Sequence, residues 1–578
     1  MNCPEEKITF AKKPRETVQV LLEDGRILTG PKNTIVGKFL KLLPEWKSPP
    51  IVSAVVDGEL RELTYPIIKD AEVKPITMHD ADGSKIYRRS LTFLLQVAFE
   101  EIFPGIELNV EHSVPSGGYF CTVIGRQPLN EKEVASLEKH MRELVKADLS
   151  IIREKVPLEE GIKYFEERGY YDKLRLLKYR KKSYLVIYRL GDHRDYHHGY
   201  MVPSTGFLDV FALLPREDGL ILQYPRRKTP TKLFQMPEYI KLRRLFHQYG
   251  KWLTNLGISS VGALDDAILS GSIREVVLVS EALHEQNISA IANCIVAKMP
   301  NVRFVLIAGP TSSGKTTFSK RLAIQLLAHG VSPLALEMDN YFVNRDQTPR
   351  DNGGNLDFEA FEAVNVTLLE KNLSDLLAGK QVQLPRFNFK LGKSEKGDKI
   401  KLNKDQVIIL EGTHGLNPKL LNKLSSNKIF RIYVSCLTQL NLDRYNRIST
   451  TDTRMLRRIV RDAQSRGFSA QRTIGMWESV RRGERRYIFP YQENADAIFN
   501  SALVYELAAL KPFAEPLLRQ IQHGTDEYLE AKRLLAFLEW FLPVDAKLIP
   551  DNSILREFIG NSILSDFKLW IESSDYRH

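Results

Sequence analysis

The sequence predicts a multidomain α/β protein whose C-terminal part contains a parallel sheet covered by helices. From residue 301 to about 515, short apolar runs alternate with helical segments, the pattern of β–α–β units. Near the start of this region, a phosphate-binding motif lies between an apolar run and a helical segment. Upstream, residues 1–75 show short alternating runs typical of a small β-rich module, and residues 76–230 mix strands with helices in an α+β pattern.

The chain of 578 residues is too long for one hydrophobic core, and about 150 residues per domain suggests roughly three to five units. We expect a helical linker over 231–300 and a helical extension over 516–578, so the predicted boundaries are 1–75, 76–230, 231–300, 301–515 and 516–578. No run of 18 apolar residues occurs, so we expect neither a transmembrane helix nor a membrane partner.

The chain is basic, with a formal net charge of +11 and a sequence pI of about 9.1. This charge favours an anionic partner such as nucleotide, RNA or acidic lipid, although a basic surface is often only solvated. The four cysteines are widely spaced without a C-x-x-C pair, so neither a structural zinc site nor a disulfide framework is indicated. The N-terminus has no apolar signal region, and we expect a cytoplasmic protein.

The phosphate-binding motif follows the apolar run 302–308 and precedes a helical segment over 317–329. Its residues match G-x-x-x-x-G-K-[ST]: Gly309, Pro310, Thr311, Ser312, Ser313, Gly314, Lys315 and Thr316. A loop at a helix N-terminus directs backbone N–H groups, here up to Thr317, toward an anion. Lys315 can reach the β- and γ-phosphates, and the Thr316 hydroxyl can bind Mg²⁺. The motif predicts ATP and Mg²⁺ as cofactors, and a glycine-rich turn is the alternative.

Two carboxylates follow strand runs of this region. Asp339 comes directly after the run 334–338, at the strand end where open α/β sheets bind ligands. It can accept a hydrogen bond from an attacking hydroxyl, or it can cap a helix. Glu411 ends the run 407–410, which is the Walker B pattern that positions Mg²⁺, or else a strand-end charge.

A group of arginines follows further along the chain. On a helix, Arg454, Arg457, Arg458 and Arg461 share one face, and Arg466 follows. Four cations on one face repel each other unless anions lie opposite, and a triphosphate under a closing lid supplies such anions. An RNA-binding or solvated face is the alternative.

Further short elements follow the phosphate loop in a characteristic order. They are Met338-Asp339-Asn340-Tyr341-Phe342, Asn355-Leu356-Asp357 with Phe361, Leu410-Glu411-Gly412, Arg461-Asp462 with Arg466-Gly467, and Ala495-Asp496-Ala497-Ile498. With these elements, residues 302–515 resemble the uridine kinase and phosphoribulokinase family. The resemblance implies a P-loop kinase in which Asp339 is the general base and Asp357 binds the ribose hydroxyls.

The same resemblance assigns the other site residues. Lys315 and Arg461 would act on the transferred phosphoryl group, Arg458 and Arg466 would hold phosphates, and Phe342 and Phe387 would line the acceptor site. The elements that read the pyrimidine depart from the family pattern, at Phe387, Gly392, Phe468 and Met476. Loss of the polar side chains that would contact the pyrimidine base predicts a different acceptor, or weaker discrimination among acceptors.

The front half carries a second resemblance. Residues 56–67, 88–95 and 191–206 are similar to parts of threonyl-tRNA synthetase, the first to its ubiquitin-like TGS domain and the others to its editing domain. The editing site of that family needs an H-x-x-x-H pair and a later Cys and His. These positions are Arg89 and Phe93, then His197 and Met201, so we expect no editing of mischarged tRNA. We expect His193, His197 and His198 to be exposed loop residues that bind no metal.

Basic runs in this half leave an RNA partner open. They are Lys173, Arg175, Lys178, Arg180, Lys181 and Lys182, then Arg226, Arg227 and Lys228, then Lys241, Arg243 and Arg244. A solvated surface explains them equally well. The leading functional prediction is a phosphotransferase acting on a nucleoside or similar small molecule. The alternatives are an RNA-binding protein with an ATPase switch and a sugar kinase, and a homo-oligomer stays open.

Overall fold

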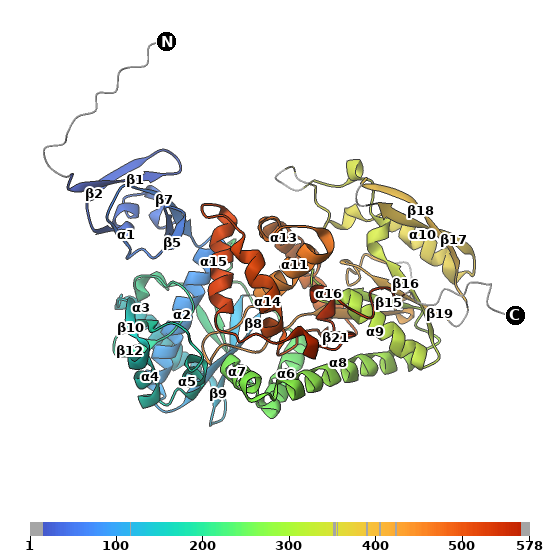
Figure 1. Cartoon of the computed structure of the whole chain (residues 1–578), viewed down its shortest axis with the longest axis horizontal. Coiled ribbons are helices and arrows are strands. Elements are labelled where there is room, and N and C mark those ends of the chain that lie inside the picture. Colours follow the sequence, from blue (N-terminus) through green and yellow to red (C-terminus); the bar gives the residue numbers. More distant parts are fainter. Residues whose placement is uncertain are drawn as a thin grey trace, which may run out of the picture. The chain divides into compact units, whose positions relative to one another are not determined.

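The computed structural model describes residues 15–115, 117–350, 354, 356–388, 391–403, 406–421 and 425–567 (Figure 1). The chain divides into two compact units. The first comprises residues 1–164, 182–236 and 522–529, and the second comprises 165–181, 237–521 and 530–578. This division is coarser than the five predicted domains, whose boundaries stay predictions. No helix in the described ranges is long and apolar enough to cross a membrane.

The first unit begins with a five-stranded sheet of order β2-β1-β7-β4-β5. Its elements are β1 (Thr17–Leu22), β2 (Ile27–Pro31), β4 (Ile51–Val56), β5 (Glu59–Arg61) and β7 (Ala71–Thr77), with helix α1 (Val36–Leu40) against it. Strand β1 pairs antiparallel with β2 and parallel with β7. Alternate residues of β1, Val18, Val20 and Leu22, are buried, so the period-2 pattern of the sequence places the core on one face.

The remainder of the first unit combines two long helices with two antiparallel sheets. The elements are α2 (Ala81–Ile102), α3 (Glu131–Lys146), β8 (Glu107–Val114), β9 (Gly118–Ile124), β10 (Ile152–Pro157), β11 (Tyr184–Leu190), β12 (His193–Asp195), β13 (Ala212–Arg216) and β14 (Gly219–Gln223). The apolar run 208–214 suggests a strand from Leu208, but β13 starts only at Ala212. The Tyr87 hydroxyl bonds both the N–H and the C=O of Val210, which therefore lies outside the ladder.

The second unit is built on a five-stranded parallel sheet of order β16-β19-β15-β20-β21. The strands are β15 (Phe304–Ala308), β16 (Ser332–Glu337), β19 (Gln406–Glu411), β20 (Ile429–Ser435) and β21 (Ala497–Asn500). All five residues of the central strand β15 are fully buried. The predicted parallel sheet is confirmed, because its continuous apolar strands are those of a sheet buried on both faces.

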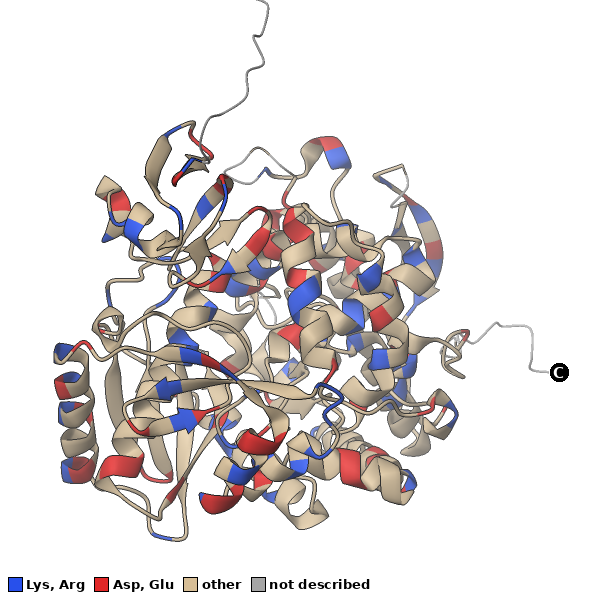
Figure 2. Ribbon diagram, turned by 60° about the vertical axis from the view of Figure 1, so that its left-hand side comes forward, with Lys and Arg blue, Asp and Glu red and all other residues tan. Residues whose placement is uncertain are grey.

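Helices and a hairpin surround this sheet. They are α5 (Tyr171–Leu177), α6 (Ile240–Leu256), α7 (Val261–Ser270), α8 (Ile273–Val296), α9 (Lys315–Ala328), α10 (Val366–Leu377), α11 (Thr450–Arg466), α12 (Ala470–Gly475), α13 (Trp477–Tyr487), α14 (Glu506–Arg519), α15 (Asp526–Leu538) and α16 (Arg556–Ile559), with β17 (Gln381–Asn388) and β18 (Lys393–Lys401). Figure 2 shows acidic and basic residues interleaved along many of these helices.

Part of the first basic run is paired inside the second unit. The Lys173 ammonium is 2% exposed and lies 3.2 Å from the Asp443 carboxylate. Arg175 and Lys178 both pair with Asp266 of α7, and Arg175 does so through its Nε. These three cations therefore have intramolecular counterions, which leaves less charge for an RNA backbone than the sequence suggests.

Truncating the central strand should destabilise the second unit. We expect Leu306→Ala to lower the free energy of unfolding by about 2–5 kcal/mol, because it leaves a cavity in a fully buried strand. Ile324→Ala, on the 38% exposed side chain of α9, is the control and should change it by less than about 1 kcal/mol. Denaturant titration measures both, and equal effects would contradict the buried position of β15.

Candidate active site

The phosphate loop connects the central strand to α9 and has the backbone that its glycines permit. Gly314 has φ +83°, in the left-handed region. A side chain at Gly309 would overlap the backbone carbonyl oxygen of Val434 on the neighbouring strand. The loop thus turns tightly between β15 and α9, and the first-turn N–H groups of α9, which lack helical partners, face the region where an anion binds.

The predicted metal-binding pair meets at the C-terminal edge of the sheet. Strands β16 and β19 are neighbours, with Glu337 opposite Glu411. The Glu411 carboxylate accepts a hydrogen bond of 3.2 Å from the Thr316 hydroxyl. Two hard oxygen ligands fit Mg²⁺, which typically takes one or two protein oxygens and completes its shell with phosphate and water. Across the described residues no cluster of three or more His, Cys, Asp or Glu side chains could hold a metal.

The carboxylates at this edge titrate unusually. Burial raises the pKa of Glu411 to about 7, against the opposing attraction of Lys315. The pKa of Asp339 is also raised, chiefly by desolvation, while Lys315 and Arg466 oppose the shift. Asp339 is nevertheless an exposed residue. Asp339, Lys315 and Arg466 therefore share one electrostatic environment, as expected for a base beside a phosphate site.

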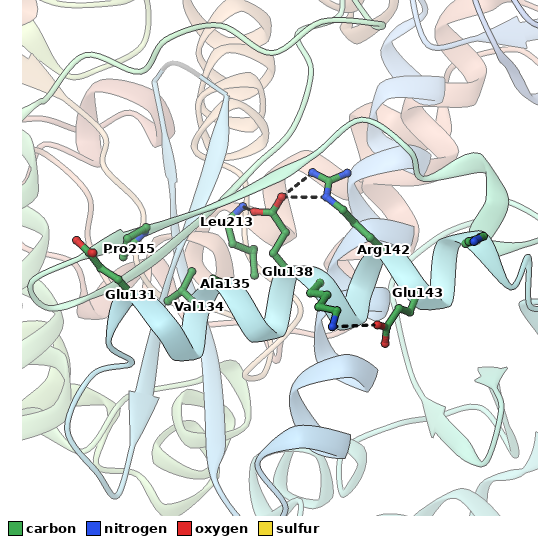
Figure 3. Close-up of a pocket in the computed structure, with 10 residues that line it drawn as sticks. Glu131, Val134, Ala135, Glu138, Arg142, Glu143, Leu213 and Pro215 are labelled. Carbon is green, nitrogen blue, oxygen red and sulfur yellow. Dashed lines mark hydrogen bonds and ion pairs between the residues drawn. The ribbon is translucent and has the colours of Figure 1, made fainter.

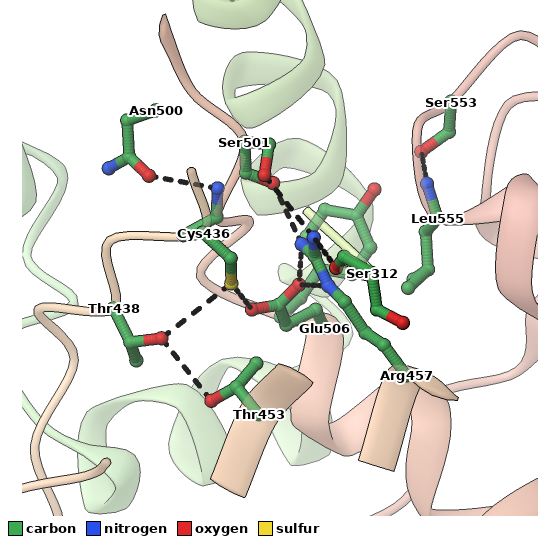
Figure 4. Close-up of polar contacts among 12 residues, drawn as sticks. Ser312, Cys436, Thr438, Thr453, Arg457, Asn500, Ser501, Glu506, Ser553 and Leu555 are labelled. Carbon is green, nitrogen blue, oxygen red and sulfur yellow. Dashed lines mark hydrogen bonds and ion pairs between the residues drawn. The ribbon is translucent and has the colours of Figure 1, made fainter. Parts of the chain in front are cut away.

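Two of the five α11 arginines do not face a ligand. Arg454 and Arg457 are 1% and 0% exposed and form ion pairs with Glu484 of α13 and Glu506 of α14. Figure 4 shows the Arg457 guanidinium between Glu506, Ser501 and Ser312. The idea that a triphosphate balances this whole face is wrong for these two residues, because carboxylates distant in sequence neutralise them.

These buried arginines hold the phosphate loop instead. Arg454 donates to the carbonyl oxygen of Thr311 at 3.0 Å, and Arg457 donates weakly to that of Ser312 at 3.4 Å. The N–H of Thr311 in turn donates to Glu484 at 3.2 Å. Two carbonyls and one N–H of the loop are therefore held by side chains of α11 and α13. No sequence signal identified this role, since the partners lie on other helices.

The other three arginines of the group gather around one buried carboxylate. Asp462 is fully buried and pairs with Arg458, Arg461 and Arg466 at 3.1, 2.9 and 3.5 Å. Arg466 remains the most exposed, at 49% of its side chain, and it influences Asp339 electrostatically. Of these three arginines, Arg466 is thus the one whose side chain is most accessible to a phosphate.

The predicted acceptor residues form a second cluster. The rings of Phe342 and Phe387 meet edge to face, with centroids 5.7 Å apart. The side-chain oxygen of Asn340, next to Asp339, accepts a hydrogen bond from the Phe387 N–H at 3.3 Å. One oxygen of Asp357 accepts from the Glu359 N–H at 3.1 Å. Asn355 lies outside the described residues.

Gly392, one of the positions that depart from the family pattern, has a cationic neighbour. Gly392 has φ +66°, and a side chain there would collide with the Arg345 guanidinium. The carbonyl of Gly392 also accepts from the Arg345 N–H at 2.9 Å. Gly392, where the sequence departs from the family pattern, thus lies beside an arginine side chain.

The editing-like positions of the first unit are packed with apolar groups. Phe93 and Met201 are 0% and 1% exposed, and the Phe93 ring lies 5.1 Å from the His197 ring. Arg89 donates to the carbonyl of Tyr200. The expectation of exposed histidines is wrong, because His197 is 3% exposed and His193 on β12 pairs with Glu100 at 3.0 Å. The absence of editing stays a prediction.

A surface depression of about 630 Å³ lies along α3 in the first unit (Figure 3). Its lining alternates acidic and basic side chains, including the Glu138–Arg142 ion pair at 2.6 Å. None of the predicted site residues lines it, so it is separate from the proposed chemistry.

Neutralising Glu411 should remove a pH dependence of stability. The folded-state pKa of about 7 lies above the ordinary value of 4.5, so the stability associated with this group is lost as pH rises through about 7. We expect Glu411→Gln to be more stable than the wild type by roughly 1–3 kcal/mol at pH 8, and the difference to shrink toward pH 5. Unfolding titrations across this range measure it, and a difference that is independent of pH would contradict the assignment.

The Arg457–Glu506 pair allows a double-mutant test. Arg457→Met alone leaves a buried unpaired carboxylate and should cost about 3–5 kcal/mol of unfolding free energy. Adding Glu506→Gln should recover part of that loss, because no buried charge is left without a partner. Denaturant unfolding of the two single variants and the double variant measures the coupling. Additive losses would show that the two side chains do not interact.

Comparisons with known proteins match two parts of the chain to different proteins. Residues 304–508 match the model of the Phosphoribulokinase / Uridine kinase family. Threonine–tRNA ligase of Psychrobacter arcticus is 32% identical over 197 residues, which cover 34% of this chain and 30% of that protein. The same enzyme of Clostridium kluyveri is 28% identical over 259 residues, covering 42% and 40%. The chain thus spans less than half the length of these relatives.

Two solved structures align with about a third of the chain. A putative fructose transport system kinase from a Silicibacter species has 18% identity and a TM-score of 0.29, covering 36% of this chain and 98% of that one. A possible uridine kinase from Bacillus stearothermophilus has 22% identity and a TM-score of 0.26, covering 37% and 98%. By the family-model match, residues 304–508, from β15 into α14, are of the phosphoribulokinase and uridine kinase family, and they follow an N-terminal half that matches threonine–tRNA ligases.

Proposed function

We propose that the protein transfers the γ-phosphoryl group of ATP to a hydroxyl of a nucleoside or related small molecule, with Mg²⁺. The observation that carries the proposal is the meeting of three predicted groups at one sheet edge. Glu411 lies 3.2 Å from the Thr316 hydroxyl, and Asp339 is within electrostatic reach of Lys315. A metal ligand pair, a phosphate-binding lysine and a base are the parts that phosphoryl transfer needs.

Each group then has a defined task. The loop amides and Lys315 hold the β- and γ-phosphates, while Thr316 and Glu411 hold Mg²⁺, which neutralises charge on the phosphates. Asp339 accepts the proton of the acceptor hydroxyl as its oxygen bonds to the γ-phosphorus and the bond to the β–γ bridging oxygen breaks. A carboxylate with a raised pKa retains that proton better than an ordinary aspartate. Arg458, Arg461 and Arg466 stabilise the charge of the transferred group.

Two aromatic rings and one arginine bear on the identity of the acceptor. A uridine-like or cytidine-like nucleoside follows from the family resemblance, and Phe342 and Phe387 offer aromatic surface to a base or sugar. Arg345 beside Gly392 favours an acceptor that carries hydrogen-bond acceptors or negative charge. A sugar acceptor is therefore the competing assignment within the same chemistry.

The test is a panel of nucleosides and sugars, with ADP release and product mass as readouts. Acceptor-dependent ADP release with a phosphorylated product supports the proposal. Release that only RNA stimulates would favour the alternative of an RNA-driven switch, which draws on the basic runs of residues 226–228 and 241–244. Identification of the product separates nucleoside from sugar acceptors.

Replacing the proposed base should separate catalysis from binding. We expect Asp339→Asn to lower kcat by about 10²–10⁴-fold, because the amide cannot accept the proton, and to leave ATP affinity within about threefold. Asp375→Asn on α10, whose carboxylate pairs with Lys380 at 2.8 Å, is the control and should keep full turnover. Steady-state kinetics with the identified acceptor gives both values. Unchanged turnover in Asp339→Asn would reject the role.

A further inference from the structure

The C-terminal segment, residues 553–565, places a carboxylate on the phosphate-binding helix. Oε2 of Glu557 in α16 accepts hydrogen bonds from both the N–H and the hydroxyl of Thr317, at 3.1 and 3.0 Å. Thr317 is the third residue of α9, and its N–H is one of the first-turn donors that the helix itself cannot satisfy. An anion from the chain therefore uses a donor that the loop would offer to a nucleotide phosphate.

The rest of the segment is packed around the same loop. Ile554 lies against Gly314, where a side chain would meet its methyl group at 2.5 Å. The Phe558 ring lies 5.0 Å from the guanidinium of Arg457, which also contacts the loop carbonyl of Ser312. Lys320 of α9 donates to the carbonyl of Leu564 at 2.5 Å. The segment is thus anchored on α9 and α11.

The charge of Glu557 opposes phosphate binding at this position. Glu557 bonds Thr317 while Glu411 bonds the neighbouring Thr316, so both carboxylates lie against the first turn of α9, which begins at Lys315. A phosphate that bonded the Thr317 N–H would compete with Glu557 for one donor and would experience its repulsion. A neutral side chain of the same shape would remove the repulsion.

We propose that Glu557 is a built-in competitor for the phosphates of a nucleoside di- or triphosphate, which bind only when its carboxylate turns away from Thr317. Ile554, Leu555 and Phe558 are fully buried, so they hold the segment in place while the Glu557 side chain moves. The C-terminal segment thereby sets nucleotide affinity. This inference rests on the proposed function, because it requires the loop to bind nucleotide.

The test compares ATP and ADP affinity of the full-length wild type with Glu557→Gln. The amide keeps the shape and an acceptor oxygen but carries no charge. We expect it to tighten binding by roughly tenfold, the scale of one charge-assisted hydrogen bond. Asp551→Asn removes an exposed carboxylate six residues earlier and should leave affinity unchanged. Titration with a fluorescent ADP analogue, displaced by ATP, gives the dissociation constants.

A thermal measurement guards against a purely structural effect. We expect Glu557→Gln to melt at or slightly below the wild-type temperature without nucleotide and to show a larger upward shift with ATP. Equal or weaker ATP binding by Glu557→Gln, with normal binding by the wild type, would overturn the inference and leave the proposed function standing. No nucleotide binding by the wild type or either variant would overturn the proposed function, and this inference with it.

Discussion

The N-terminal end of α9 is the interaction on which the candidate site depends. A short loop that only glycine permits at Gly309 and Gly314 turns the chain from β15 into this helix, and its first-turn N–H groups, which have no partner within the helix, create a local positive potential. Lys315 adds a full charge at the same place. Around this point, the fold arranges carboxylates from three directions: the sheet edge, α13 and the C-terminal segment.

The arginines near this point differ in exposure: buried ones hold the phosphate loop, and the exposed Arg466 is accessible to a phosphate. Arg454 and Arg457 are buried with Glu484 and Glu506, and their cost of desolvation is offset by several hydrogen bonds each, including those to the loop carbonyls. Arg466 is exposed and lies near Asp339. Burial therefore separates structural arginines from those able to meet a phosphate, although all belong to one helix.

The residues that match the family pattern and those that depart from it lie in different parts of the protein. The phosphate-binding residues keep the geometry that the motif predicts, whereas the acceptor side has a glycine beside Arg345 and an apolar pair of rings. In the first unit, the apolar side chains of Phe93 and Met201 fill two of the four positions where an editing site would need polar ones. In both halves, the altered positions are thus those of polar groups that, by the resemblance, would contact a ligand.

Sequence patterns alone predict the local elements of this protein. Periodicity and spacing predict the motif between β15 and α9, Glu411 at the end of β19, and Asp339, which lies two residues beyond the end of β16. Which side chains pair with one another, in contrast, depends on the tertiary structure. Helix spacing placed Arg454, Arg457, Arg458 and Arg461 on one face, but the acids that bury the first two lie 30 and 49 residues away in the chain. Glu557 lies 240 residues from Thr317, and no local pattern carries such a contact, since it arises only when α16 packs against α11 and α9.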